Sequence, residues 1–299
     1  MKQLLAVDWG TSSLRGALLD SEGRVLKERS FPRGILTVAS GDFATVFEAC
    51  FAHWIGATGT FCLISGMAGS KQGWLEAPYC ACPAGFDEVA SQLAWVKAGR
   101  IAIVPGLSCE HEGIPDVMRG EETQVLGALQ LLGLQDGLLI LPGTHSKWVS
   151  VRGGRIEDFS TRMTGEFYAL LRQHSLLARS MPDTDGEVDW AAFDEGVALA
   201  LRGAGLLQTA FSVRTLSLFG RMAAARLPSY LSGLVIGEEI RARDLPGGTK
   251  VVLIGAELLT ERYERALQQR QAVVQRLGAE ATWRGLWTLA QTIHPSWDA

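Results

Sequence analysis

The chain has 299 residues, of which 47% are hydrophobic and 20% are charged, and its formal net charge is −4. This length exceeds the roughly 100 to 200 residues of one domain, so we expect two domains. The negative charge gives no electrostatic reason to expect a nucleic acid or an anionic membrane as a partner. No apolar run approaches the roughly 18 residues of a membrane span, and no signal-peptide pattern opens the chain, so we expect a cytoplasmic protein.

The cysteines and histidines do not favour a metal site. The chain has five cysteines, an odd number, and it is long enough to need no disulfide bonds for stability, so we expect reduced thiols. Cys80 and Cys82 are separated by one residue, whereas zinc sites use wider spacings and a second pair. His111 stands between two glutamates, and we expect it to lie in a solvated loop.

The first stretch reads as a strand, a small-residue turn and a returning strand. An apolar run, Leu4–Val7, ends in Asp8 and turns through Gly10–Ser13 before the apolar run Leu14–Leu19. Val25–Phe31 predicts a third strand, which completes an antiparallel meander.

A turn of Gly, Thr and Ser can direct backbone N–H groups and short hydroxyls into one concavity that holds phosphate oxygens. Asp8 at the strand end is placed to hold hydrated Mg²⁺ beside those phosphates. An ordinary hairpin whose turn needs small polar residues carries about the same weight. The stretch is not a Walker loop, because no Gly-Lys-Ser/Thr follows it.

A glycine-rich loop follows the next predicted strand. Apolar residues at helical spacing predict a helix over residues 43–55, and Thr60–Ser65 and Arg100–Val104 read as short buried strands. Between those strands, Ser65–Trp74 combines three glycines with Ser, Lys, Gln and Trp, as expected of a site for a polyhydroxylated ligand. The alternative is a flexible surface loop.

Two adjacent acids enter the next predicted helix, which we place over Asp116–Leu134. Glu121 and Glu122 read either as partners of the helix dipole or as a general base at a cleft. A carboxylate that acts as a general base would accept the proton of an attacking hydroxyl.

The opening design then recurs. Gly137–Leu141 predicts a strand, Gly143-Thr144 begins a turn, a strand starts at Val149, and Gly153-Gly154 turns the chain back through Ile156–Phe159. This recurrence suits a duplicated unit that faces itself across a cleft, with one loop holding phosphates from each side.

The C-terminal part is largely helical from Met163 to about Asp244. Lys250–Ile254 then predicts a strand that ends in Gly255-Ala256, followed by a helix. Such a turn would admit an adenine or ribose close to the backbone, although every connection of this kind needs something small. Trp283–Ile293 predicts the last helix.

Taken together, these stretches resemble one family, the 2-dehydro-3-deoxygalactonokinases of the actin, hexokinase and Hsp70 superfamily. The first loop, with Arg15 at the arginine of its pattern, is generic to that superfamily, whereas two of the motifs are specific to the family. The similar segments are Val7–Arg15, Ser65–Ser70, Pro115–Gln124 (which contains Met-Arg-Gly-Glu-Glu-Thr-Gln), Leu141–Trp148 (which contains Gly-Thr-His-Ser-Lys-Trp) and Met163–Glu166.

The resemblance implies an α/β fold of two ribonuclease-H-like, actin-like ATPase domains, residues 1–117 and 118–299, around an interdomain ATP cleft. It implies a phosphotransferase that moves the γ-phosphoryl group of ATP, with Mg²⁺, to the 6-hydroxyl of 2-dehydro-3-deoxy-D-galactonate in galactonate breakdown. The partners so implied are ATP and a small sugar acid, with no nucleic acid and no membrane. A homodimer stays open.

The resemblance also implies roles for individual residues. Larger sugar kinases carry their base in a Gly-Asp-Gln turn, where this chain has Gly120-Glu121, so the base assignment is Glu121 first, Glu122 second and Asp116 third. Asp8 would hold Mg²⁺ through water. The other implied contacts are Gly10, Thr11, Ser12, Arg15, Gly143, Thr144 and Ser146 for the ATP phosphates, Gly255 and Ala256 for adenosine, and Ser65, Gly66, Met67, Ala68, Gln72, Trp74 and Lys147 for the sugar acid.

Three other functions stay open at this point. One is a kinase for a related acid, such as the gluconate epimer, since the choice of epimer depends on one hydroxyl. Another is a regulator that binds a sugar acid without transferring phosphate. The third is an actin-like assembly protein, for which the residues of the sugar-acid loop would have no purpose.

Overall fold

The computed structural model describes residues 3–55 and 60–294. Contacts divide the chain into two compact units. Unit 1 comprises Met1–Leu139, Val149–Ser160 and Leu277–Ala299, and unit 2 comprises Ile140–Trp148 and Thr161–Arg276.

Unit 1 extends beyond residue 117 because helix α3 (Glu121–Leu132) packs against helix α10 (Glu280–Ile293), which in turn contacts the first sheet. The two units are defined by packing contacts, whereas the two predicted domains are defined by a repeated strand topology. The two ribonuclease-H-like domains, 1–117 and 118–299, therefore stay a prediction.

The first sheet has six strands in the order β3-β2-β1-β4-β7-β6. The predicted antiparallel meander is confirmed, and β4 and β7 continue the sheet in parallel. The edge strand β6 was not predicted. The strands are β1 (Gln3–Trp9), β2 (Leu14–Leu19), β3 (Val25–Phe31), β4 (Thr60–Gly66), β6 (Ala94–Lys97) and β7 (Ile101–Ile103).

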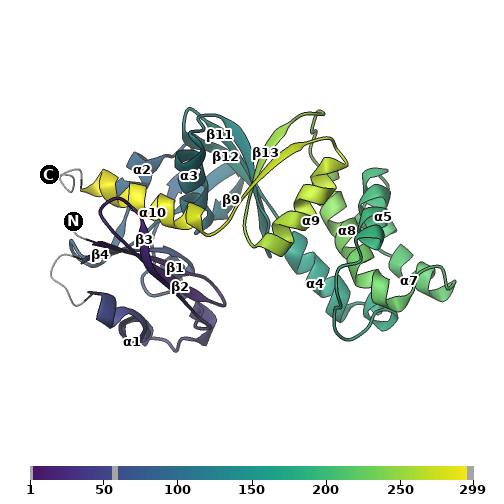
Figure 1. The fold of residues 1–299 in the computed structure, drawn as a ribbon, viewed down its shortest axis with the longest axis horizontal. Coiled ribbons are helices and arrows are strands. Elements are labelled where there is room, and N and C mark those ends of the chain that lie inside the picture. The colour runs from purple at the N-terminus through teal and green to yellow at the C-terminus, as the bar shows by residue number, and fades with distance from the viewer. Residues whose placement is uncertain (1–2, 56–59, 295–299) are drawn as a thin grey trace. The chain divides into compact units, whose positions relative to one another are not determined.

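Strand β1 is buried on both faces, which explains its continuous apolar run. Leu5, Val7 and Trp9 belong to a core shared with the aromatic residues of helix α1 (Phe43–Ile55). Successive side chains of a strand point to opposite faces, so Leu4 and Ala6 lie on the other side, where α10 contacts the strand (Figure 1).

The second sheet repeats the topology of the first. Its strand order is β12-β11-β10-β13-β14. Taken in chain order, these five strands occupy the same places as β3-β2-β1-β4-β7 in the first sheet, so the recurrence predicted from the sequence is confirmed. Strand β14 was not predicted. The strands are β10 (Gly137–Leu141), β11 (Ser146–Arg152), β12 (Arg155–Arg162), β13 (Lys250–Ile254) and β14 (Val273–Leu277).

A third, small sheet and an early strand correct the predicted helix over Asp116–Leu134. Strand β9 (Ile114–Met118) contains Asp116 and pairs with β8 (Gly106–His111), which pairs with β5 (Tyr79–Ala81). Helix α3 begins only at Glu121, after Gly120, whose φ of 105° is not helical. The prediction failed because a strand and a helix meet here with only two residues between them.

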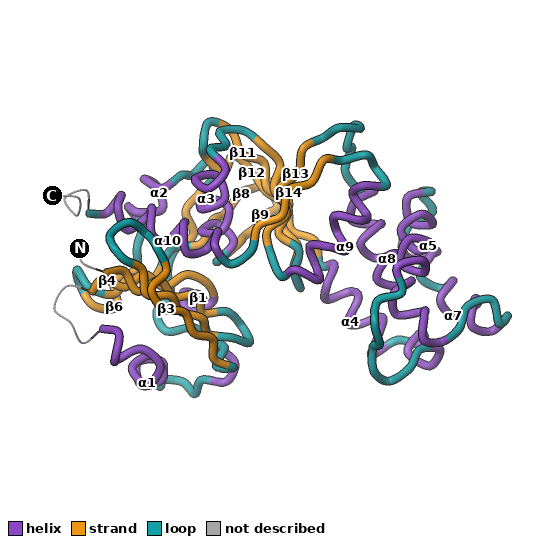
Figure 2. Tube along the Cα trace, viewed as in Figure 1, coloured by secondary structure: helices purple, strands orange, loops and turns teal. Residues whose placement is uncertain are grey.

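Helices predominate between residues 163 and 244, as predicted (Figure 2). The fifteen-residue helix α8 is buried along most of its length and packs mainly against α5. The remaining helices are α2 (Phe86–Ser91), α4 (Thr164–His174), α5 (Trp190–Leu201), α6 (Leu206–Thr209), α7 (Ser212–Leu218), α8 (Leu227–Arg241) and α9 (Glu257–Gln268).

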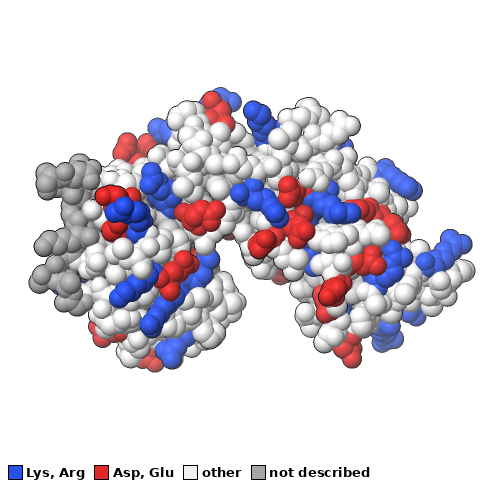
Figure 3. Space-filling model, in the orientation of Figure 1, with Lys and Arg blue, Asp and Glu red and all other residues white. Residues whose placement is uncertain are grey.

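The surface carries both signs of charge. On the face drawn in Figure 3, Lys and Arg side chains alternate with Asp and Glu over both units. Within residues 3–55 and 60–294, every helix is too short or too polar to cross a membrane.

A buried carboxylate organises the core of unit 2. Glu239 on α8 is 5% exposed and accepts hydrogen bonds from four side chains. Trp148 Nε1 and Tyr263 Oη donate at 2.5 and 2.6 Å, Ser146 Oγ donates at 2.7 Å, and Thr164 Oγ1 donates as well. A charge can be buried when donors replace its water, and here the donors come from β11, α4 and α9. Glu239 therefore ties three elements to α8.

We expect Glu239→Ala to lower the free energy of unfolding by at least about 3 kcal/mol, because each buried donor left without a partner costs about 1–3 kcal/mol. Urea unfolding followed by circular dichroism measures it. The matched control is Glu238→Ala on the same helix, which removes a partly exposed ion pair with Arg241 and should cost at most about 1 kcal/mol. Equal losses in the two variants would contradict the role of Glu239.

Candidate functional site

The first predicted phosphate loop is a tight turn whose hydroxyls face solvent. The Gly10 N–H donates to Ser13 O at 2.9 Å, and the carbonyl oxygens of Gly10 and Thr11 accept from the amides of residues 35–36. The side chains of Thr11 and Ser12 are exposed. The turn is thus fixed by its carbonyl groups, which leaves its short polar side chains open to a solute.

Asp8 and Arg15 form an ion pair beside this turn. They lie opposite each other on β1 and β2, and Arg15 Nη2 contacts Asp8 Oδ2 at 2.5 Å. The guanidinium also lies over the ring of Trp283, 5.8 Å from its centroid. The Asp8 carboxylate is 16% exposed, so a solute at the end of β1 can reach it.

Two glycines let the end of β4 approach the start of α3. Gly66 has a φ of 93°, and a Cβ there would lie 2.8 Å from the carbonyl oxygen of Trp9. A Cβ on Gly120 would lie 3.2 Å from the Cα of Gly66. Across this contact, Ser65 Oγ and Thr123 Oγ1 share a hydrogen bond of 2.9 Å. The structure thereby brings the predicted sugar-acid loop, Ser65–Trp74, beside the paired acids Glu121 and Glu122.

The two acids at the start of α3 have different environments. Glu121 is half-buried, and its Oε2 accepts from the Arg119 N–H at 3.0 Å. Glu122 is fully buried and accepts from the Gly120 N–H at 2.6 Å and from Thr123 Oγ1 at 3.0 Å. Burial, and then the charge of Glu121, raise the pKa of Glu122 to about 7. Of the two, Glu121 is the carboxylate that a solute can reach.

The predicted sugar-acid loop is mostly inside the molecule. Gln72 is exposed, Met67 and Trp74 are half-buried, and Ala68 is fully buried like Ser65 and Gly66. Trp74 packs on the rings of Trp9 and Phe47, with centroids 6.1 and 5.2 Å apart. Tryptophan here joins the aromatic core, and its role as a wall for a ligand stays a prediction.

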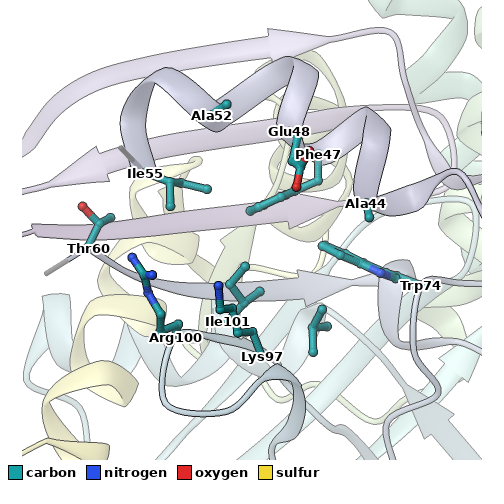
Figure 4. A pocket seen from close by; sticks show the side chains of 11 residues that line it. Ala44, Phe47, Glu48, Ala52, Ile55, Thr60, Trp74, Lys97, Arg100 and Ile101 are labelled. Atoms are coloured by element: carbon teal, nitrogen blue, oxygen red, sulfur yellow. The ribbon is translucent and has the colours of Figure 1, made fainter. Parts of the chain in front are cut away.

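A separate pocket of about 650 Å³ lies between α1 and the strands β4, β6 and β7 (Figure 4). Phe47 and Trp74 belong to its apolar lining. Lys97, Arg100 and Glu48 add charges of both signs. The pocket touches Thr60, at the end of β4 opposite to Ser65. Trp74 is the one residue that it shares with the predicted site.

Arg119 is a residue of this region that the sequence analysis did not single out. It is 9% exposed, lies 4.3 Å over the Tyr79 ring and donates through Nη2 to the Ala77 carbonyl at 2.8 Å. Its Nε and Nη1 atoms have no hydrogen-bond partner among the described residues. The sequence places this arginine two residues before Glu121, but nothing in the sequence indicates that it is buried.

In unit 2, the second predicted phosphate loop is braced by the start of α4. The Glu166 N–H donates to the Thr144 carbonyl at 3.0 Å, and His145 Nε2 contacts Glu166 Oε2 at 2.6 Å. A Cβ on Gly165 would lie 2.5 Å from the carbonyl oxygen of Gly143, so only glycine fits there. This contact gives a structural reason for the paired motifs Gly-Thr-His-Ser-Lys-Trp and Met-Thr-Gly-Glu.

Two side chains of this motif are turned inward. Ser146 is fully buried and donates to Glu239, and Lys147 is 6% exposed and donates through Nζ to Thr161 Oγ1 at 2.8 Å. Thr144 is exposed and Gly143 half-buried. At the predicted adenosine turn, Gly255 is half-buried and Ala256 is exposed at the start of α9.

A solved structure with low sequence identity to this chain shows the class of its fold. The activator of 2-hydroxyisocaproyl-CoA dehydratase from Clostridium difficile, solved with bound ADPNP, matches at a TM-score of 0.52 and 9% identity over 99% of this chain and 98% of that one. With the repeated sheet order, this likeness confirms the predicted α/β fold of the actin-like ATPase class.

The chain belongs to the 2-keto-3-deoxy-galactonokinase family, whose model matches residues 8–289. A protein of Rhizobium meliloti (strain 1021), named as a probable 2-dehydro-3-deoxygalactonokinase, is 38% identical over 97% of each chain. The 2-dehydro-3-deoxygalactonokinase of Escherichia coli (strain K12) is 35% identical over 88% of this chain and 89% of its own. The crystal structure of a Sinorhizobium meliloti protein, provisionally assigned the same activity, matches with a TM-score of 0.89 and 38% identity over 98% of this chain and 99% of that one.

We expect Glu122→Gln to change how stability depends on pH. Because the folded-state pKa lies near 7, above the ordinary 4.5, the protein loses stability as pH rises from about 4.5 to about 7 and no more above that range. A glutamine avoids that loss. Relative to the wild type, the variant should therefore gain up to about 3 kcal/mol of unfolding free energy between about pH 5 and about pH 8.

Urea unfolding at the two pH values measures this difference. The control is Glu48→Gln on α1, which makes the same substitution at an exposed position. An identical pH dependence in Glu122→Gln and the wild type would contradict the assigned pKa.

Proposed function

We propose that this protein is an ATP-dependent kinase that phosphorylates the 6-hydroxyl of 2-dehydro-3-deoxy-D-galactonate. The observation that carries the proposal is family membership over residues 8–289, together with two relatives that bear this activity in their names. Because intracellular ATP would be the donor, we propose the cytoplasm as its location.

The two glycine loops are the proposed phosphate sites. In the first, Gly10 and the exposed Thr11 and Ser12 would hold phosphate oxygens, with Arg15 offsetting their charge. In the second, Gly143 and Thr144 would do the same. The contacts of Ser146 favour a different role, which is to position this loop through Glu239. The turn at Gly255 and Ala256 stays the proposed adenosine site.

Glu121 is the proposed general base. It would take the proton of the 6-hydroxyl as that oxygen bonds to the γ-phosphorus, while the bond to the bridging oxygen breaks and ADP leaves. Its partial exposure and its place beside Gly66 and Ser65 support this choice. Glu122, buried and bonded to Gly120 and Thr123, would position the start of α3. Asp116 lies on strand β9, before that turn.

The residues near Asp8 fit a magnesium ion held through water. A carboxylate at a strand end, 16% exposed and beside a loop of hydroxyls, is the usual protein contribution to such a site. Bound there, Mg²⁺ would neutralise charge on the phosphates. Asp8 also contacts Arg15, so the two side chains would share the task of balancing that charge.

Arg119 supports an acidic substrate. Its positive charge lies beside Gly69 in the sugar-acid loop, where a Cβ would be 2.7 Å from its Nη1. A buried cation raises the local potential and favours a carboxylate nearby. Exposed Gln72 and half-buried Met67 are the side chains of the loop that a sugar acid would contact, with Lys147 as a further proposed cation. Trp74, Ser65, Gly66 and Ala68 would then shape the loop from beneath.

A coupled ADP-release assay with Mg-ATP tests the function. The acceptors are 2-dehydro-3-deoxy-D-galactonate, its gluconate epimer, galactonate and a blank without sugar. We expect release that depends on the first compound and prefers it over its epimer. Stronger release with another acid would reassign the substrate, and binding of ATP without release on a wider panel of acids would favour a non-catalytic binding protein.

We expect Glu121→Gln to lower kcat by at least about a hundredfold with little change in ATP affinity, because loss of a general base affects the transition state more than binding. Asp116→Asn is the matched control and should stay within about threefold of the wild type. Turnover at the wild-type level in Glu121→Gln would refute the assignment, and a large loss in Asp116→Asn alone would move the base to strand β9.

A further inference from the structure

Three side chains of metal-binding type converge on one face of unit 1, in a place that the proposed kinase site does not use. Cys109 and His111 are two residues apart on β8, so they point to the same side of the strand. Asp158 comes from β12, about fifty residues later. The three ligand atoms all lie within 4.8 Å of one another.

The distances match those of a tetrahedral zinc site. With Zn–S near 2.3 Å, Zn–N near 2.05 Å and Zn–O near 2.0 Å, a tetrahedron places sulfur and nitrogen about 3.6 Å apart and nitrogen and oxygen about 3.3 Å apart. Cys109 Sγ lies 3.5 Å from His111 Nε2, and His111 Nε2 lies 3.3 Å from Asp158 Oδ1. Two of the three separations therefore match a tetrahedral site, and the third, between Cys109 and Asp158, is within 4.8 Å.

Cys109 Sγ and His111 Nε2 also share one acceptor. Both lie near the carbonyl oxygen of Phe159, at 3.2 and 2.9 Å, which holds the two side chains close together. A divalent cation at this place would favour the thiolate of Cys109 and pair with the carboxylate of Asp158.

His111 is exposed, as predicted, but it ends strand β8 instead of lying in a loop, and it contacts residues of β12. Its side chain is 44% exposed and that of Asp158 is 46% exposed, so an ion can enter from solvent and water can complete its coordination.

We propose that Cys109, His111 and Asp158 form a zinc-binding site that joins β8 to β12. One sulfur, one imidazole and one carboxylate suit Zn²⁺ better than Mg²⁺ or Ca²⁺, which prefer oxygen ligands alone. Strand β9 pairs with β8 and leads directly to Arg119 and Glu121. An ion at this place would hold the hairpin that carries the chain into the proposed kinase site.

The test is binding of Zn²⁺ to the full chain, measured by calorimetry after removal of metal with a chelator. We expect one ion per chain in the wild type and an affinity at least about tenfold lower in Cys109→Ser and His111→Ala, since even changes behind the ligands cost that much. With Co²⁺ as the probe, the wild type should show a sulfur-to-cobalt charge-transfer band in the near ultraviolet, which Cys109→Ser should lack.

The matched control is Cys82→Ser. Cys82 lies beside the site, since its N–H donates to the Ser108 carbonyl at 2.8 Å, but its thiol is outside the group of three. This variant should keep both the stoichiometry and the cobalt band. Loss of either in Cys82→Ser would overturn the ligand assignment, and equal binding by all variants would show surface binding only and overturn the site.

Thermal unfolding gives a readout that separates this proposal from the kinase function. Zn²⁺ should raise the Tm of the wild type by a few degrees and leave the Tm of Cys109→Ser unchanged, because a ligand that binds only the folded state stabilises it. The same shift in both proteins would refute a role for Cys109. None of these measurements requires turnover, so the proposed zinc site and the proposed kinase function can be refuted independently of each other.

Discussion

The buried carboxylate of Glu239 is the constraint around which unit 2 is built. A charge with 5% exposure is stable only when donors surround it, and four side chains do so. Two of those donors, Ser146 and Trp148, belong to the Gly-Thr-His-Ser-Lys-Trp motif, and Thr164 belongs to Met-Thr-Gly-Glu. Several residues of these motifs are therefore required by the core around Glu239. Their contacts in turn fix the exposed turn at Gly143 and Thr144.

In unit 1, the buried carboxyl group of Glu122 has fewer hydrogen-bond donors than Glu239 has in unit 2. The carboxyl group of Glu122 accepts from backbone N–H groups of its own turn and from one hydroxyl, and its neighbour Glu121 adds a like charge. With less compensation for its burial, its pKa rises to about 7. The bond from Thr123 to Ser65 then connects this acid to the end of β4. In each unit a buried glutamate holds a loop in place, and the side chains left exposed beside it are the candidates for chemistry.

The sequence was sufficient for most of the fold, because hydrophobic runs and glycine turns are local signals. The strands of both meanders, helix α1 and the βα unit at Lys250 were predicted from such signals. The three-stranded sheet and β14 were not, since short, half-exposed strands such as β9 lack a clear alternation. Asp116 was placed on a helix because nothing in the sequence shows that Gly120 takes a φ of 105°.

For the candidate site, residue type was predictable and side-chain direction was not. Ser146 and Thr144 are two residues apart and both suit phosphate, yet only Thr144 is exposed, because Glu239 on a distant helix takes the hydroxyl of Ser146. The same limit applies to Ala68 and Trp74, which belong to the core around Trp9. It also explains His111, which the sequence predicts in a loop. Its partners stand on β12, and a contact between distant strands leaves no trace in local spacing.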